Sequence, residues 1–156
     1  MEHSPRERAH ARPATRKLID DLMRERRQML VLLANLIKLN LYNVDHKVEV
    51  ALEEFLTLLV DYIAAGHFGL YQRLVEGTER RQPVMEAARE ALGPITASTD
   101  VAVRFSERYE KATPQLMNDR LAADLSSLAE QISIRVSLED TLIMAMLGEV
   151  PPPPAV

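Results

Sequence analysis

The sequence predicts an all-α protein, an antiparallel bundle of four main helices with short extra helices. Apolar residues recur three and four positions apart along most of the 156 residues, which is the period of an amphipathic helix. No stretch of any length alternates apolar and polar residues with the period of two that indicates a strand. Pro, Gly and Asn separate the helical patterns with short connections, and such connections favour antiparallel neighbours.

The composition bounds the fold and excludes several classes of function. With 47% hydrophobic residues, the chain can bury one sizeable core as a single domain. Its net charge of -4 argues against a direct nucleic-acid binder, which needs a broad basic face. The absence of Cys excludes disulfides and thiolate sites. No apolar run reaches the roughly 20 residues of a membrane span, so we expect a cytoplasmic protein that does not act at a membrane.

Three regions are expected along the chain. Residues 1–14 lack apolar periodicity and carry mostly basic charges, which predicts a flexible basic N-terminal tail. The helical bundle domain is expected at residues 15–148, with Thr15 as its first N-cap and Gly148 as its stop. Residues 149–156 are rich in Pro and predict a stiff C-terminal tail.

Apolar periodicity and the positions of Pro and Gly place the helices within this domain. We expect helical segments at residues 15–40, 46–65, 70–77, 83–92, 95–109 and 117–147. Pro83 suits the first position of a helix, where its missing N–H has no intrahelical partner to lose. Gly93-Pro94 is expected to interrupt the helix that Pro83 begins, because Pro inside a helix removes a hydrogen bond and clashes with the preceding turn.

The stretch Leu58–Tyr71 is expected to form a bend between the second and third helices. It lies among four of the seven aromatic residues of the chain, Phe55, Tyr62, Phe68 and Tyr71. Gly66 follows a strong helical pattern, and a Gly in that place is usually the left-handed C-terminal cap. We therefore expect an abrupt bend that presents Asp61, His67, Phe68 and Tyr71.

The last helix places two charged residues on its apolar face. Its seam steps by four, three and four along Leu121, Leu125, Leu128 and Ile132. The same stepping next reaches Arg135 and Glu139, which are four residues apart and able to pair. In the alternative interpretation the helix rotates slightly after Ile132, so that Ile134 and Leu138 face inward and Arg135 is exposed. Both interpretations fit the sequence.

The sequence offers no support for a catalytic or metal site. Carboxylate-bridged di-iron bundles need Glu-x-x-His on two helices, and here that spacing occurs only at Glu7–His10 in the expected tail. We interpret His67 as a hydrogen-bonded structural residue. No phosphate-binding Gly loop, nucleophile elbow or paired-carboxylate motif is present. We therefore expect no metal, no cofactor and no enzyme activity.

Several blocks of the sequence resemble the Rsd/AlgQ family of bacterial transcription regulators. They are Lys17-Leu18-Ile19-Asp20, Leu59-Val60-Asp61-Tyr62 with Ala65-Gly66-His67-Phe68 and Tyr71, and Arg135 with Leu138-Glu139-Asp140 and Leu142-Ile143. They follow one another in the family's order and span most of the chain. Leu22 departs from the family pattern, in which a Trp is expected.

The resemblance implies an anti-sigma factor. Such a protein binds region 4 of the primary sigma factor, the basic module that reads the −35 promoter element, and hinders its use by RNA polymerase. Asp61, Ala64 and Phe68 match the family's sigma-contacting positions, and we add Tyr71 to the expected partner-binding residues. Ala64 departs from the usual Ser, so one hydrogen bond to the partner is expected to be missing. The bound form is expected to be a monomer.

A competing hypothesis comes from another class of protein. Tyr62, His67, Arg135 and Glu139 could form an internal polar cluster that lines a pocket, in a bundle that binds a small ligand or serves in stress responses. An interior acid, base and phenol could move protons. Solvent-connected volume at this cluster would favour the pocket, whereas a closed core behind an acidic, apolar patch would favour a protein partner. A regulator of this family with a changed partner is a third possibility.

Overall fold

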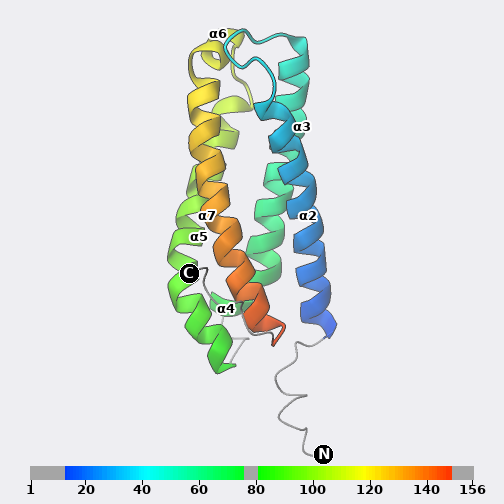
Figure 1. Ribbon diagram of the computed structural model, residues 1–156, viewed down its shortest axis with the longest axis vertical. Coiled ribbons are helices and arrows are strands. Elements are labelled where there is room, and N and C mark those ends of the chain that lie inside the picture. Colours follow the sequence, from blue (N-terminus) through cyan, green and yellow to red (C-terminus); the bar gives the residue numbers. More distant parts are fainter. Residues whose placement is uncertain (1–12, 76–80, 149–156) are drawn as a thin grey trace, which may run out of the picture.

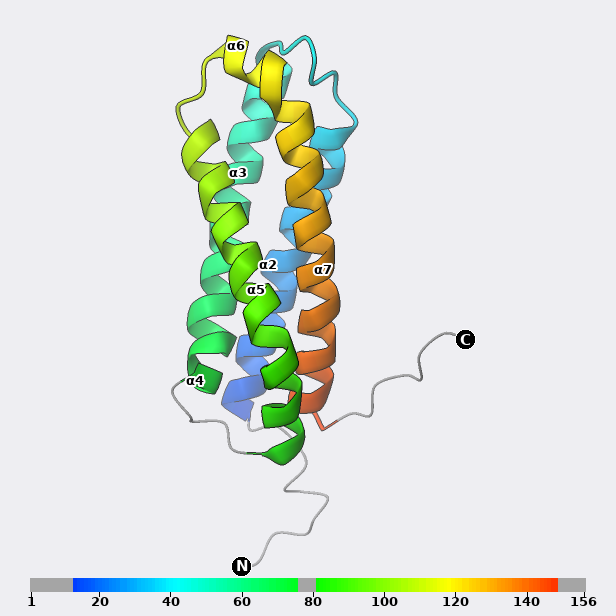
Figure 2. The same cartoon turned by 90° about the vertical axis from the view of Figure 1, so that its left-hand side faces the viewer.

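The computed structural model describes residues 13–75 and 81–148, and this part of the chain is a bundle of helices without strands. Its elements are α2 (Pro13–Ile37), α3 (His46–Gly66), the π-helical turn η1 (His67–Tyr71), α4 (Gln72–Val75), α5 (Gln82–Tyr109), α6 (Pro114–Leu116), the π-helical turn η2 (Met117–Leu121) and α7 (Ala122–Met146). The long helices run alternately up and down the molecule (Figures 1 and 2). The predicted all-α antiparallel bundle is confirmed.

Several helix ends have identifiable chemical causes. The Asp45 side chain caps α3 by accepting a hydrogen bond from the backbone N–H of Val48 at 3.0 Å. Thr113 caps the entry to the last helix in the same way. Gly148 has a φ of 75°, the left-handed conformation that the sequence predicted for the stop after α7.

The first helix begins earlier than the sequence predicted. α2 starts at Pro13, so residues 13 and 14 are helical and the predicted N-cap at Thr15 is wrong. Thr15 is instead buried, and its hydroxyl oxygen accepts a hydrogen bond from Arg73 Nη1 at 2.7 Å. The predicted tails at residues 1–12 and 149–156 lie outside the described residues, as does the predicted end of the third helix at Gly77.

The predicted interruption at Gly93-Pro94 is also wrong, because α5 continues through both residues. A residue that precedes Pro is normally driven from the helical conformation by a clash between its Cβ and the Pro ring. Gly93 has no Cβ, and both residues are exposed, so the ring displaces no neighbouring helix. Packing along the rest of α5 then holds the helix together across the lost hydrogen bond.

The chain does not turn away at Gly66, contrary to the prediction of a left-handed cap there. Gly66 is right-handed helical, with φ −64° and ψ −50°, and the helix continues through η1 into α4. Within η1 the backbone N–H of Gln72 donates to the carbonyl of His67, five residues earlier. Such a π-helical turn accommodates one extra residue in a continuous helix. The expected bend is therefore a local widening of the helix.

The core lies along the axis of the bundle. α2 packs extensively on α3 and α5 on α7, whereas α3 and α5 meet over a much smaller surface. Phe55 of α3 and Phe105 of α5 bridge that sparser interface, with ring centroids 6.2 Å apart in an edge-to-face arrangement. Two features follow from this layout: a polar cluster inside the bundle, and a groove on the side where α3 and α5 diverge.

Candidate functional site

Arg135 and Glu139 of α7 both face the interior of the bundle. Each has 0% of its surface exposed, and Arg135 Nε lies 3.2 Å from Glu139 Oε2. Ile134, which the alternative helix rotation would have buried, is 44% exposed. The inward pairing predicted from the α7 seam is confirmed, and the rotated register is wrong.

Glu139 is the hub of what we call the buried cluster, formed by Arg26, Tyr62, Tyr71, Arg135 and Glu139. Its Oε1 accepts hydrogen bonds from the Tyr62 hydroxyl at 2.7 Å and from Arg26 Nη1 at 3.2 Å. Its Oε2 accepts from the Tyr71 hydroxyl and from Arg135 Nε. One carboxylate therefore holds side chains from α2, α3, η1 and α7.

Arg135 extends the buried cluster to α5. Its Nη1 donates to the Thr99 hydroxyl at 2.7 Å and to the Ser98 hydroxyl at 3.2 Å. Its guanidinium carbon lies 5.1 Å from the ring centroid of Tyr62 and 5.3 Å from that of Tyr71, within reach of a cation–π interaction. Its Nη2 has no hydrogen-bond partner among the described residues.

Arg26 was not anticipated from the sequence, although the signal was present. It is buried in α2, and its Nη2 donates to Asp140 Oδ1 at 2.7 Å. Leu22, Arg26 and Met29 step by four and three along the buried face of α2, as the residues of α7 do. Extending the argument used for Arg135 to α2 would have placed Arg26 in the core.

The protonation states of the buried cluster follow from burial and from the charge of Glu139. Burial raises the pKa of Tyr62 and of Tyr71, and the negative charge of Glu139 raises both further. Burial alone would lower the pKa of Arg135, but the two tyrosines and Glu139 reverse the shift and raise it. The tyrosines therefore stay neutral donors and Arg135 stays charged near neutral pH.

The π-helical turn brings Tyr71 to Glu139. Tyr71 follows Tyr62 by nine positions, and at about 100° per residue an ideal helix would place the two on opposite faces. One extra residue in the turn reduces the angle between them to about 80°. Tyr71 is thus buried, with 6% exposure, and its assignment to the partner-binding surface is corrected: it belongs to the buried cluster.

The same turn directs His67 and Phe68 outward. Gly66, Gly69 and Leu70 face the interior, whereas His67 is exposed and Phe68 is 69% exposed. The prediction that His67 joins the internal cluster is therefore wrong. Its ring instead contacts that of Phe68 edge to face, with centroids 4.8 Å apart.

An exposed surface lies on the outer side of α3 and η1, opposite the side that faces the buried cluster. We call it the patch, formed by Asp61, Ala64, His67 and Phe68 on consecutive turns of α3 and η1. Asp61 is exposed and Ala64 is half-buried. Asp61 makes no hydrogen bond or ion pair with the rest of the described chain. Of the predicted partner-binding residues, the structure thus brings Asp61, Ala64 and Phe68 together at the surface.

Gly66 is required for close packing of α3 against the buried cluster. A Cβ at this position would lie 2.8 Å from Cε2 of Tyr71 and 3.0 Å from Nη2 of Arg135. Both neighbours belong to the buried cluster, where hydrogen bonds to Glu139 hold their side chains in place. The absence of a side chain therefore matters here for space and not for backbone conformation.

We expect Gly66→Ala to lower the free energy of unfolding by about 1–3 kcal/mol, the usual cost of overpacking a core. This loss should exceed the gain of about 1 kcal/mol that Ala brings to a helix interior. Gly69→Ala is the matched control in the same turn, because its Cβ would meet Leu18 Cδ2 at an ordinary 3.5 Å. Urea denaturation measures both. Equal or greater stability of Gly66→Ala would contradict the packing role.

Two surveys of the described residues bear on other classes of function. No group of three or more His, Asp or Glu side chains in this part of the chain is placed to hold a metal ion. None of its helices combines the length and apolar character needed to cross a membrane.

Comparison with known proteins places this architecture in a family. A family model described as "Regulator of RNA polymerase sigma(70) subunit, Rsd/AlgQ" matches residues 3–147. A protein of Enterobacter sp. (strain 638) named "Regulator of sigma D" is 33% identical over 134 residues, which cover 84% of this chain and 81% of the relative. The protein of that name from Salmonella arizonae is 31% identical, covering 82% of this chain and 80% of the relative.

No solved structure matches the chain. The family match nevertheless spans nearly all of the described residues, including both the buried cluster and the patch. The chain belongs to the Rsd/AlgQ family of regulators of the RNA polymerase sigma(70) subunit.

Proposed function

We propose that this protein is an anti-sigma factor that binds region 4 of the primary sigma factor through the patch. Occupying that basic module hinders its docking on core polymerase and on the −35 element, and so favours alternative sigma factors. The single observation that carries the proposal is Phe68, a large aromatic with 69% of its surface in solvent beside Asp61. Family membership supplies the class of partner.

The chemistry of the patch suits such a partner. An exposed aromatic becomes an anchor when a partner buries it, and aromatic residues are prominent among interface hot spots. The Asp61 carboxylate beside it complements Lys and Arg, which a DNA-reading module carries for phosphate contacts. Ala64 between them offers a methyl group and no hydrogen bond. The patch therefore combines an apolar centre with an acidic edge.

The interior supports a protein partner over a small ligand. Tyr62, Arg135 and Glu139 are fully buried, and their polar atoms are directed toward one another. We propose a role in holding the fold for the buried cluster, and binding for the patch, by one copy of the chain on one sigma factor in the cytoplasm.

The test is the affinity of Phe68→Ala for purified primary sigma factor. We expect a loss of about 2 kcal/mol or more, roughly a thirtyfold rise in Kd, with little change in melting temperature because the side chain is exposed. Isothermal titration calorimetry measures the Kd. Ile134→Ala is the matched control, since Ile134 is an exposed apolar residue of α7 outside the patch. Lost thermal stability with unchanged affinity would show that Phe68 serves the fold.

A further inference from the structure

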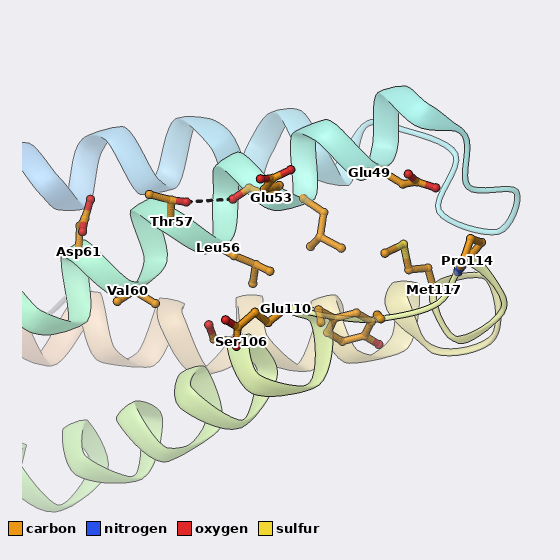
Figure 3. Close-up of a pocket in the computed structure, with 13 residues that line it drawn as sticks. Glu49, Glu53, Leu56, Thr57, Val60, Asp61, Ser106, Glu110, Pro114 and Met117 are labelled. Carbon is orange, nitrogen blue, oxygen red and sulfur yellow. Dashed lines mark hydrogen bonds between the residues drawn. The ribbon is translucent and has the colours of Figure 1, made fainter.

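A groove runs along α3 on the side facing α5 (Figure 3). It encloses about 700 Å³, and its far wall comes from the end of α5 and the connection to α7. In Figure 3 the side chains of Leu56 and Val60 extend from α3 toward Ser106 of α5 and Glu110, the residue that follows α5. The groove lies where α3 and α5 pack over their small shared surface.

The lining of the groove is apolar and acidic. Glu49, Glu53 and Asp61 of α3 and Glu110 beyond α5 contribute four carboxylates, whereas no Lys, Arg or His lines it. Leu56, Val60 and other apolar side chains provide the rest of the surface. A groove of this kind complements an amphipathic helix that places apolar residues on the floor and cationic residues at the rims.

The groove and the patch form one continuous surface. The α3 residues that line the groove recur every three or four positions from Glu49 to Asp61, which keeps them on one side of the helix. Asp61 belongs to both surfaces, and the next positions on that side are Ala64 and Phe68. The twelve steps from Glu49 to Asp61 along α3 measure about 18 Å, so the groove accommodates about three turns of a second helix.

We propose that this groove binds a basic amphipathic helical segment of the same protein partner whose other part covers the patch. The inference rests on the proposed function for the identity of the partner. It extends that function, because recognition then requires two elements of the partner: one at Phe68 and a cationic helix along α3. The segment after Gly148 is a poor alternative occupant, because it contains no Lys or Arg.

The experiment compares two double variants on the same helices. Glu53→Gln with Glu110→Gln removes two carboxylates from the groove, whereas Glu54→Gln with Glu107→Gln removes two exposed carboxylates that do not line it. Both change the net charge equally. We expect the groove variant to raise the Kd for full-length primary sigma factor by about three- to tenfold, as exposed charge pairs typically contribute, and the control variant to leave it unchanged. Equal effects of the two variants, or no effect of either, would overturn the proposal.

A second probe separates the groove from the identity of the partner. A synthetic helical peptide of about 14 residues with Leu on one face and Lys on the other should bind the wild-type chain and the control variant, and bind the groove variant more weakly. If the wild-type chain binds this peptide but not sigma factor, the proposed function fails while the groove chemistry stands. If removal of residues 1–12, which include Arg6, Arg8 and Arg12, tightens peptide binding, the chain's own leading segment is the occupant and the partner segment is not.

Discussion

Replacing Glu139 with Leu is expected to lower the free energy of unfolding by about 3–5 kcal/mol, the usual cost of removing one partner of a buried ion pair. The Glu139 carboxylate accepts hydrogen bonds from both cluster tyrosines and from both cluster arginines. Without it, the charge of Arg135 stays buried with neutral partners only: the hydroxyls of Tyr62, Ser98 and Thr99, the Ile95 carbonyl and the rings of Tyr62 and Tyr71. Arg26 loses less, since it keeps Asp140 at 2.7 Å.

The double variant Glu139→Leu with Arg135→Met isolates this effect. Removing the orphaned charge should restore part of the loss, so the double variant is expected to be less destabilised than the sum of the single variants by more than about 1 kcal/mol. Urea denaturation of the wild type, both single variants and the double variant completes the cycle. Additivity within about 0.5 kcal/mol would contradict direct coupling between the two side chains.

The single variant Glu139→Leu should also weaken partner binding, although Glu139 is buried. Glu139 holds Tyr71, the last residue of η1, and η1 displays Phe68 on its outer side. Without the carboxylate the turn is less ordered in the free protein. Binding must then order it, and the free-energy cost of that ordering lowers the affinity. We expect Glu139→Leu to reduce affinity for sigma factor at temperatures where the variant is still folded. This link would give a reason for a buried ionic network, rarely superior to apolar packing for stability, to lie behind the proposed binding surface.

The sequence predicts the helical content and the inward pairing on α7 because both follow from the spacing of apolar residues along the chain. Arg135 and Glu139 continue the steps of an apolar seam, although the rotated register also fits the sequence and the burial of the two side chains decides between them. The π-helical turn could not be found in this way. The turn allows the Tyr71 hydroxyl to reach Glu139 Oε2, and these two residues are 68 positions apart in the sequence. Locally, a Gly at the end of a helical pattern indicates a cap more often than a packing site.

The other errors have the same origin. Gly93-Pro94 is a strong local signal for a break, yet the extended packing of α5 along the bundle outweighs one lost hydrogen bond. The competing pocket hypothesis places His67 in the interior, whereas the extra residue in η1 brings Tyr71 inward and His67 lies at the surface.

Charge reversal at Asp61 is expected to abolish partner binding. Asp61→Lys would place like charges against each other at a basic partner, which costs several kcal/mol, or at least about a hundredfold in Kd. Asp61→Asn removes the attraction without adding repulsion, and we expect about a tenfold loss. Glu54→Lys is the matched control, because Glu54 is an exposed carboxylate of α3 outside both the patch and the groove.

The salt dependence of association tests the electrostatic origin of these losses. Steering between an acidic patch and a basic module accelerates association, and raising the ionic strength from about 0.01 M to 0.15 M shortens the screening length from about 30 Å to 8 Å. The wild-type association rate, followed by stopped-flow fluorescence of labelled sigma factor, should therefore fall with added salt, and that of Asp61→Asn should fall less steeply. Association rates that do not change with salt would show that Asp61 acts through shape and not through charge.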